Sequence, residues 1–79
     1  MKVIVSETPR RIARLQRSSP VLLRVKSGSV RIAQEQESLF GGDGLPVTAA
    51  DGIQSWIWPE GEFWVCADAG GALIEVILP

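Results

Sequence analysis

Apolar and polar residues alternate with a period of two along most of this chain, which is the spacing of a β-strand with one buried face. Residues 21–32 show this pattern clearly. One face carries Val21, Leu23, Val25, Val30 and Ile32, and the other carries Arg24, Lys26 and Arg31. The Ser27-Gly28 pair interrupts the alternation and predicts a tight turn, so we expect a β-hairpin here.

Two later segments, residues 53–58 and 62–67, are apolar on both faces. Trp56 and Trp58 lie opposite Ile53 and Ile57 in the first, and Phe63, Val65 and Ala67 lie opposite Trp64 and Cys66 in the second. Pro59-Glu60-Gly61 predicts a turn, and a hairpin would set Trp64 across from one of the other tryptophans. A strand of a two-layer sandwich buries one face. The second apolar face therefore needs cover from another sheet, another subunit or a ligand.

The remaining segments complete an all-β pattern. Residues 2–6 and 73–78 alternate as strands do. Residues 8–20 fit a short helix or a strand, and we favour the strand because the neighbouring segments are strands. Residues 38–52, with four glycines and one proline, are predicted to be a loop. We expect a small antiparallel β-sandwich, or a jelly roll or barrel, with no α-helix longer than two turns. Residues 1–79 form one domain, in which residues 1–19 are an N-terminal arm or an edge strand.

The short length makes the core of this domain marginal, because a chain of 79 residues buries only about 60–65% of its unfolded surface. Small folds add disulfides, metals or oligomerisation. Cys66 is the single cysteine and histidine is absent, so we expect no disulfide, no metal and no cofactor. Oligomerisation or docking on a partner therefore remains as the way to stabilise this small core. The N-terminal apolar stretch is too short for a signal peptide, and no apolar run has membrane-spanning length.

Charge is divided unevenly along the chain. Residues 1–34 contain all eight basic residues and one acid, and residues 35–79 contain the other eight acids. Either strands from the two halves interleave and neutralise each other, or the asymmetry serves a charged partner. For the second case we expect an exposed basic surface that meets carboxylates of a neighbouring chain. Its candidate interface residues are Arg10, Arg11, Arg14, Arg24 and Arg31. Nucleic acid is not the expected partner, because the tryptophans that would stack on bases lie in the acidic half.

Catalysis finds little support in the residue types present. Without histidine, a serine or cysteine nucleophile needs a lysine or carboxylate base, and neither lysine lies near Cys66 in the sequence. Cys66 alternates onto the Trp64 face, where a buried structural thiol is the ordinary explanation. The Gly41–Gly44 segment lacks the lysine and following helix of a phosphate-binding loop. We therefore expect no catalytic residues and no enzymatic activity.

The three tryptophans are the other candidate interface residues. Each indole can bury on the order of 150–250 Å². A row of aromatic rings can bind sugar by stacking, but aromatic residues are also enriched at the buried centre of protein interfaces. We interpret Trp56, Trp58 and Trp64 as core or interface residues, and we expect at least one of them to contact another chain.

A resemblance to a known group of proteins rests on Leu22–Val25, Gly28–Ile32, Gly44–Val47, Gly61–Ala67 and Gly70–Leu78. From about Pro20 onward, this order of strand and turn motifs resembles the small structural proteins of tailed-bacteriophage virions. Ala33-Gln34 departs from the pattern, because such proteins often carry glycine after the strand that ends at Ile32.

The resemblance implies a β-module without catalytic activity that is made in the host cytoplasm and assembles on the virion. The expected role is capsid decoration or cementing, with the neck, tail or fibre as alternatives. The implied partners are the major capsid protein or other virion proteins and further copies of the chain, with a trimer as the expected homo-oligomer. A different class remains open, a module that binds carbohydrate or single-stranded nucleic acid.

Overall fold

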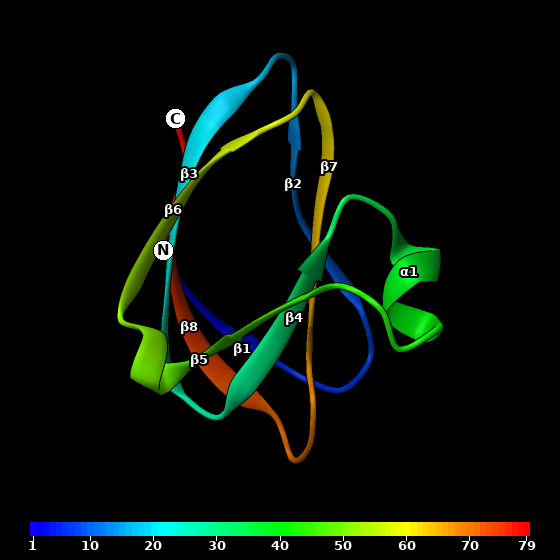
Figure 1. The fold of residues 1–79 in the computed structure, drawn as a ribbon, viewed down its shortest axis with the longest axis vertical. Coiled ribbons are helices and arrows are strands. Elements are labelled where there is room, and N and C mark those ends of the chain that lie inside the picture. The colour runs from blue at the N-terminus through cyan, green and yellow to red at the C-terminus, as the bar shows by residue number, and fades with distance from the viewer.

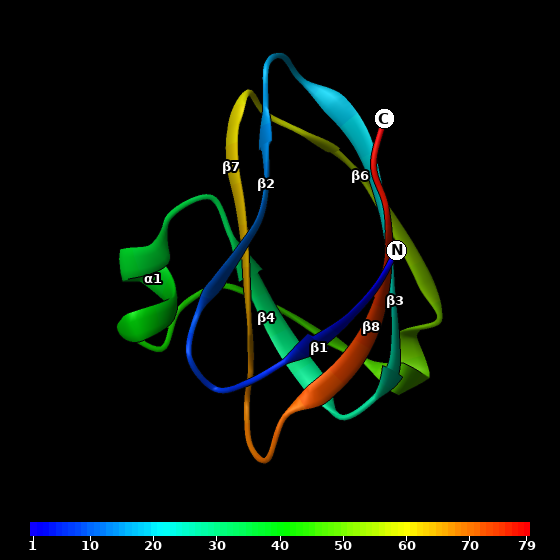
Figure 2. The same ribbon diagram turned by 180° about the vertical axis from the view of Figure 1, so that it is seen from behind.

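Eight short strands form two antiparallel four-stranded sheets in the computed structural model, which describes residues 1–79 (Figures 1 and 2). Sheet A has the strand order β1-β8-β3-β6, and sheet B has the order β2-β7-β4-β5. The elements are β1 Lys2–Val5, β2 Arg10–Leu15, β3 Ser19–Ser27, β4 Ser29–Ala33, α1 Gln36–Phe40, β5 Leu45–Thr48, the 3₁₀ helix η1 Ala49–Asp51, β6 Ile53–Trp58, β7 Gly61–Ala67 and β8 Ala72–Ile77. The prediction of an all-β sandwich is confirmed.

The chain crosses from one sheet to the other at almost every connection. Only β4 and β5, which are joined through α1, follow each other within one sheet. The predicted hairpin over residues 21–32 is therefore wrong, because β3 pairs with β6 and β8 while β4 pairs with β5 and β7. The predicted hairpin between β6 and β7 is wrong for the same reason. Alternation fixes which face of a strand is buried, but it carries no information about the strand's partner.

The hydrophobic core fills the space between the two sheets. Sixteen buried residues contribute to it, and no polar or charged residue is buried. The largest fully buried side chain is Phe63, which packs against Trp58 with ring centroids 4.7 Å apart. The five apolar residues predicted for the buried face of residues 21–32 are all at most 2% exposed, so the alternation identified that face correctly.

The structure shows the secondary structure of two segments that the sequence left uncertain or predicted to be a loop. Residues 10–15 form strand β2, as we favoured, which lies at the edge of sheet B, and β1 lies at the edge of sheet A. The loop predicted over residues 38–52 is only partly correct. Its first residues belong to α1, a helix of five residues, and Leu45–Thr48 forms the edge strand β5, which tolerates Pro46 because an edge strand has unpaired positions. Tertiary contacts made by Leu39 and Val47, which are both buried, stabilise elements that the local sequence does not favour.

Gly28 allows the turn between β3 and β4 to pack tightly against the turn between β7 and β8. Its φ is +82°, and a Cβ placed on it would lie 2.7 Å from the Gly71 carbonyl oxygen and 3.0 Å from the Ala72 Cβ. Gly42 has a similar φ of +85°, but a Cβ there would meet nothing within 4 Å. The two positions therefore separate the cost of a left-handed backbone from the cost of a steric clash.

We expect Gly28→Ala to lower the free energy of unfolding by about 3 kcal/mol, because it combines backbone strain with a clash against backbone atoms. Gly42→Ala is the matched control and should cost about 1 kcal/mol, the strain alone. Urea unfolding followed by tryptophan fluorescence measures both values. Equal losses for the two variants would show that the close approach at Gly28 does not contribute to stability.

Candidate protein-interaction surface

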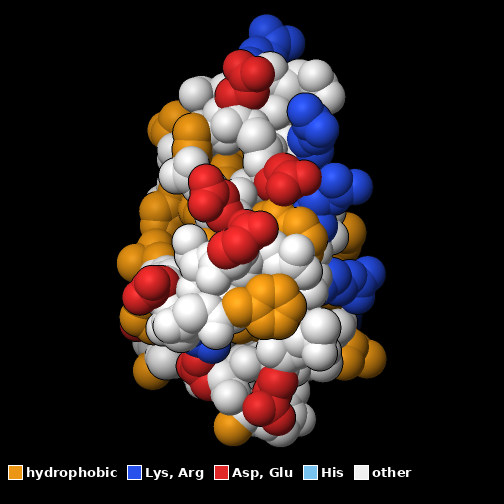
Figure 3. Space-filling view, turned by 90° about the vertical axis from the view of Figure 1, so that its right-hand side faces the viewer, with side chains coloured by type: hydrophobic (Ala, Val, Ile, Leu, Met, Phe, Trp, Pro, Cys, Tyr) orange, Lys and Arg blue, Asp and Glu red, His pale blue; other side chains and the backbone are white.

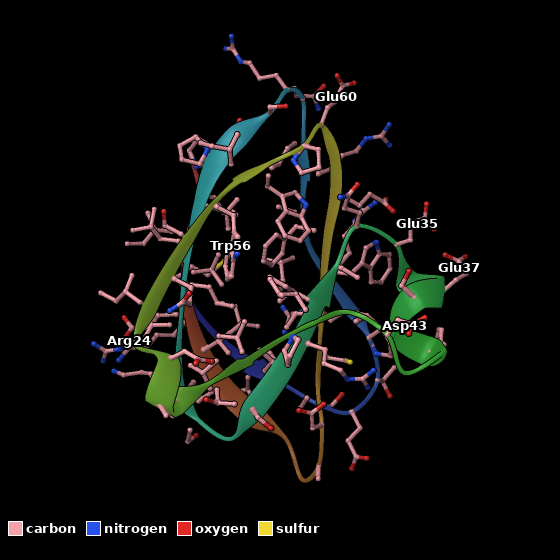
Figure 4. The ribbon with its side chains drawn as sticks, viewed as in Figure 1. Arg24, Glu35, Glu37, Asp43, Trp56 and Glu60 are labelled. Carbon is pink, nitrogen blue, oxygen red and sulfur yellow. The ribbon has the colours of Figure 1, made fainter.

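The three tryptophans lie mainly inside the subunit. Trp58 is 7% exposed and belongs to the core, and its indole N–H donates a hydrogen bond to the Glu62 carbonyl oxygen at 3.0 Å. Trp56 is half-buried on the interior side of β6, with its ring edge-on to Trp58 (Figure 4). Trp64 is half-buried on the opposite face of β7. The structure therefore contains no row of exposed aromatic rings.

The outer face of sheet B is covered by the short helix α1. Leu39 of α1 packs against Ala33 and Cys66, and Trp64 borders this second cluster (Figure 1). The indole N–H of Trp64 donates to a Glu62 carboxylate oxygen at 3.0 Å. Burial raises the pKa of the Cys66 thiol, which keeps it protonated and poorly nucleophilic. On the second apolar face of β7, Cys66 is thus buried within the subunit, and Trp64 is covered in part.

Arg31 ties this covering helix to the sheet. Its Nε donates to Asp68 Oδ1 at 2.9 Å, and its Nη1 donates to the carbonyl oxygens of Asp43 at 3.0 Å and Leu39 at 3.4 Å. Ser29 holds the other Asp68 oxygen with a 2.8 Å hydrogen bond. Arg31 was predicted as an interface residue, but its guanidinium is engaged by groups of its own chain.

The outer face of sheet A, in contrast, has no cover. Ile4, Ile53, Ile57 and Ile77 are 61–79% exposed, and the half-buried Leu22 and Leu73 lie beside them. In the strand register Leu22 pairs with Ile77 and Ser55, and Pro20 pairs with Ile57, so these apolar side chains are neighbours across three strands. Exposed isoleucines in such a row are costly in water unless a partner covers them.

A row of charges crosses this apolar face. The Glu75 carboxylate lies 3.2 Å from Lys26 Nζ and 3.4 Å from Arg24 Nη2, and Lys2 pairs with Glu75 in the strand register. The hydrogen bond from Lys26 and the nearby positive charges of Lys26, Arg24 and Lys2 lower the pKa of Glu75. The row divides the isoleucines into two groups and gives the surface a polar element that can fix the orientation of a partner.

Neither hollow beside this face combines the size and the polar lining of a typical ligand site, because the larger one, with a volume of about 330 Å³, is lined only by apolar residues. The first, with a volume of about 130 Å³, is lined by Met1, Leu22, Leu23, Arg24, Ile53, Glu75 and Ile77. Pockets for small molecules have volumes of about 300–1,000 Å³ and contain several convergent polar groups. Here Arg24 and Glu75, the two charged lining groups, already pair with each other. The second hollow, beside Met1, is lined only by apolar residues. This geometry fits an extended protein contact better than a small-molecule site.

The charge division of the sequence is largely resolved within the subunit. All four ion pairs join the basic first part of the chain to the acidic second part: Arg11 with Glu62, Arg24 and Lys26 with Glu75, and Arg31 with Asp68. Strands from the two parts therefore interleave, as the first interpretation holds. Arg10 and Arg14 are exposed and take part in no ion pair. Of the five candidate arginines, these two make no ion pair, although Arg10 Nη1 donates a hydrogen bond to the Ile4 carbonyl oxygen at 3.5 Å.

No group of three or more histidine, cysteine, aspartate or glutamate side chains is arranged to hold a metal ion. No helix of the structure has the length and apolar character needed to cross a membrane. Comparisons of the chain with protein-family models, with curated proteins and with solved structures found no match.

The isoleucines of sheet A were visible in the sequence but were not selected as site residues. Residues 53–58 were predicted to be apolar on both faces, but the tryptophans were chosen as the interface residues because aromatic residues are enriched in many interfaces. In the structure the tryptophans of β6 take the interior face, which leaves Ile53 and Ile57 outside. The size of an indole gives the physical reason, since burying the larger apolar side chain removes more area from water.

We expect the protein to lose stability in acid through Glu62 and Glu75. Hydrogen bonds from Trp64 and Arg11 lower the pKa of Glu62, and Lys26 lowers that of Glu75, both from an ordinary value of 4.5. Because these folded-state pKa values lie below the unfolded value, the stabilisation is complete above pH 4.5 and is lost as the pH falls through the folded values.

Urea unfolding between pH 7 and pH 2 tests this expectation. Glu62→Gln and Glu75→Gln should be less stable than the unmodified chain at neutral pH and should approach its stability at low pH. Glu60→Gln serves as the control because Glu60 is exposed and forms no ion pair. Stability curves for the two variants that stay parallel to the unmodified chain would contradict the assignment.

Proposed function

We propose that the protein is a structural subunit of a phage virion that decorates or cements the capsid, and that it docks through the outer face of sheet A. The observation that carries the proposal is the set of four exposed isoleucines on that face, Ile4, Ile53, Ile57 and Ile77. Ile4 and Ile57 are 79% and 74% exposed, whereas on the second face of β7 Cys66 is buried beside Leu39 of α1 and Trp64 is half-buried. A subunit that functions within an assembly accounts for this difference.

The resemblance of the sequence to small virion proteins gives the proposal its biological setting. Such modules act without catalysis, and the present chain contains no histidine and no group of three or more cysteine, aspartate or glutamate side chains arranged to hold a metal ion. The expected partner is the major capsid protein or another virion protein. An apolar patch crossed by the Arg24–Glu75–Lys26 charge row can bind a protein surface with complementary apolar and charged groups.

Carbohydrate binding is less well supported by the geometry. A sugar site built on stacking needs exposed aromatic faces, whereas Trp58 is in the core, Trp56 faces the interior and Trp64 packs beside α1. Phe40 is the only aromatic side chain that is mainly exposed, and it stands alone on α1.

The primary test is the composition of purified particles of the phage that encodes this chain. The protein should be present at a fixed number of copies, and particles assembled without it should bind the purified chain. Its absence from purified particles, or a failure to bind to particles that lack it, would overturn the proposal.

Substitutions on sheet A test which surface is used. We expect Ile57→Glu and Ile77→Glu to weaken rebinding to deficient particles at least about tenfold, since each places an unpaired charge in an apolar contact. Both side chains are exposed, so folding should be unaffected and circular dichroism should match the unmodified chain. Gln16→Glu, in the exposed turn after β2, introduces the same charge and should bind normally. Unchanged binding of the isoleucine variants would place the docking surface elsewhere.

A further inference from the structure

The side of the molecule that carries α1 has charges of opposite sign on its two halves. In Figure 3, which views this side, Lys and Arg side chains run down one edge while most Asp and Glu side chains gather over the middle and the other edge. Among the basic residues, Arg10 and Arg14 belong to β2 and Arg17 to the turn after it. Among the acidic residues, Glu37 belongs to α1, and Glu35 and Asp43 belong to the loops that flank it.

These six side chains make no ion pairs within the subunit. Arg11 and Arg31, which lie among them in the sequence, are taken by Glu62 and Asp68. The three unpaired arginines are exposed, and so are the three carboxylates. The arginines and the carboxylates therefore carry equal and opposite charge, and neither group is neutralised by an ion pair within the subunit.

The acidic group also stands out from the surface. Figure 4 shows Glu35, Glu37 and Asp43 on α1 and on the loops before and after it, at the side away from sheet A, and Figure 1 shows α1 projecting beyond sheet B. Strand β2 lies at the edge of sheet B with one side unpaired. The acidic helix α1 thus projects from this side of the molecule, and the stripe of Arg10, Arg14 and Arg17 lies on the same side but protrudes less.

We propose that this side of the molecule binds a second copy of the chain about a two-fold axis that runs roughly along the strands. Such a rotation sets two copies face to face and exchanges the halves, so that each α1 meets the other copy's Arg10, Arg14 and Arg17. A two-fold contact of this kind uses the same patch on both subunits. Phe40, which is 66% exposed on α1, supplies apolar area to the contact.

Matching charge identifies the partner as a second copy. A nucleic-acid strand laid on the arginine stripe would meet like charge from the carboxylates of the neighbouring α1, which disfavours it. A wholly acidic protein surface would meet the same repulsion. Another copy of this chain presents arginines to the carboxylates and carboxylates to the arginines, so both groups are neutralised together.

The test is a charge exchange followed by sedimentation equilibrium of the full chain. The stripe variant carries Arg10→Glu and Arg14→Glu, and the helix variant carries Glu35→Lys and Glu37→Lys. The unmodified chain should dimerise at about 0.05 M salt and dissociate towards 1 M, where the screening length falls to about 3 Å. Each variant alone should dimerise at least about tenfold more weakly, because like charges then face each other.

A mixture of the two variants in equal amounts should recover the dimer, because the acidic stripe of one then meets the basic helix of the other. This recovery also shows that both variants are folded. Ala69→Glu, in the exposed turn between β7 and β8, adds a negative charge away from both surfaces and should dimerise as the unmodified chain does. Circular dichroism confirms the fold of each variant.

Several results would overturn the proposal. These are a monomer at every concentration and salt, an assembly of three chains, variants that dimerise normally, or a mixture that stays monomeric. Binding of the unmodified monomer to oligothymidylate, with loss of binding in the stripe variant, would assign the arginines to nucleic acid instead. None of these results bears on docking through sheet A, which involves different residues.

Discussion

A β-strand has two faces, and a sandwich of two sheets can bury only one of them. The rest of this structure follows from that constraint, because several strands carry apolar side chains on both faces. In sheet B the second face of β7 is covered by α1, a helix of only five residues that is held in place by Leu39 and by the hydrogen bonds of Arg31. In sheet A nothing comparable covers Ile4, Ile53, Ile57 and Ile77. The asymmetry between the two sheets is the main structural argument for a partner.

The sequence predicted the buried faces well and the strand partners poorly. Val21, Leu23 and Val25 are buried as their alternation requires, since period-two patterning records contact with the core. The same pattern arises whether the next strand pairs alongside or crosses to the opposite sheet. That is why Ser27-Gly28 was interpreted as a hairpin turn although it links the two sheets. The helix α1 was missed because its stability comes from the packing of Leu39, which local sequence does not reveal.

The candidate surfaces divide in a similar way. The sequence indicated that Arg24 and Arg31 point away from the core, and they do, but it could not show that Glu75 and Asp68 lie within reach of them. Ion pairs between distant residues depend on strand register, which appears only in the fold. Once these pairs are accounted for, Arg10 and Arg14 are the candidate arginines left for intermolecular contacts.

The outer faces of sheets A and B point in opposite directions (Figures 1 and 2), so one subunit can use both faces at once. A two-fold dimer formed through sheet B would present two sheet A faces on opposite sides, which makes it a bridging unit rather than a cap.

The position of β8 has a consequence for how the protein is made. This strand is the last of the eight in chain order, yet it lies in the interior of sheet A and pairs with both β1 and β3. On a ribosome, residues 72–77 emerge after the other seven strands, so β1 and β3 have no strand between them until β8 has been synthesised. The crossings between sheets also remove the local hairpins that commonly form first, and non-local pairing of this kind slows folding towards the millisecond-to-second range, roughly. Sheet A can therefore be completed only after β8 is available, and any truncation before Ala72 leaves sheet A without the strand that joins β1 to β3.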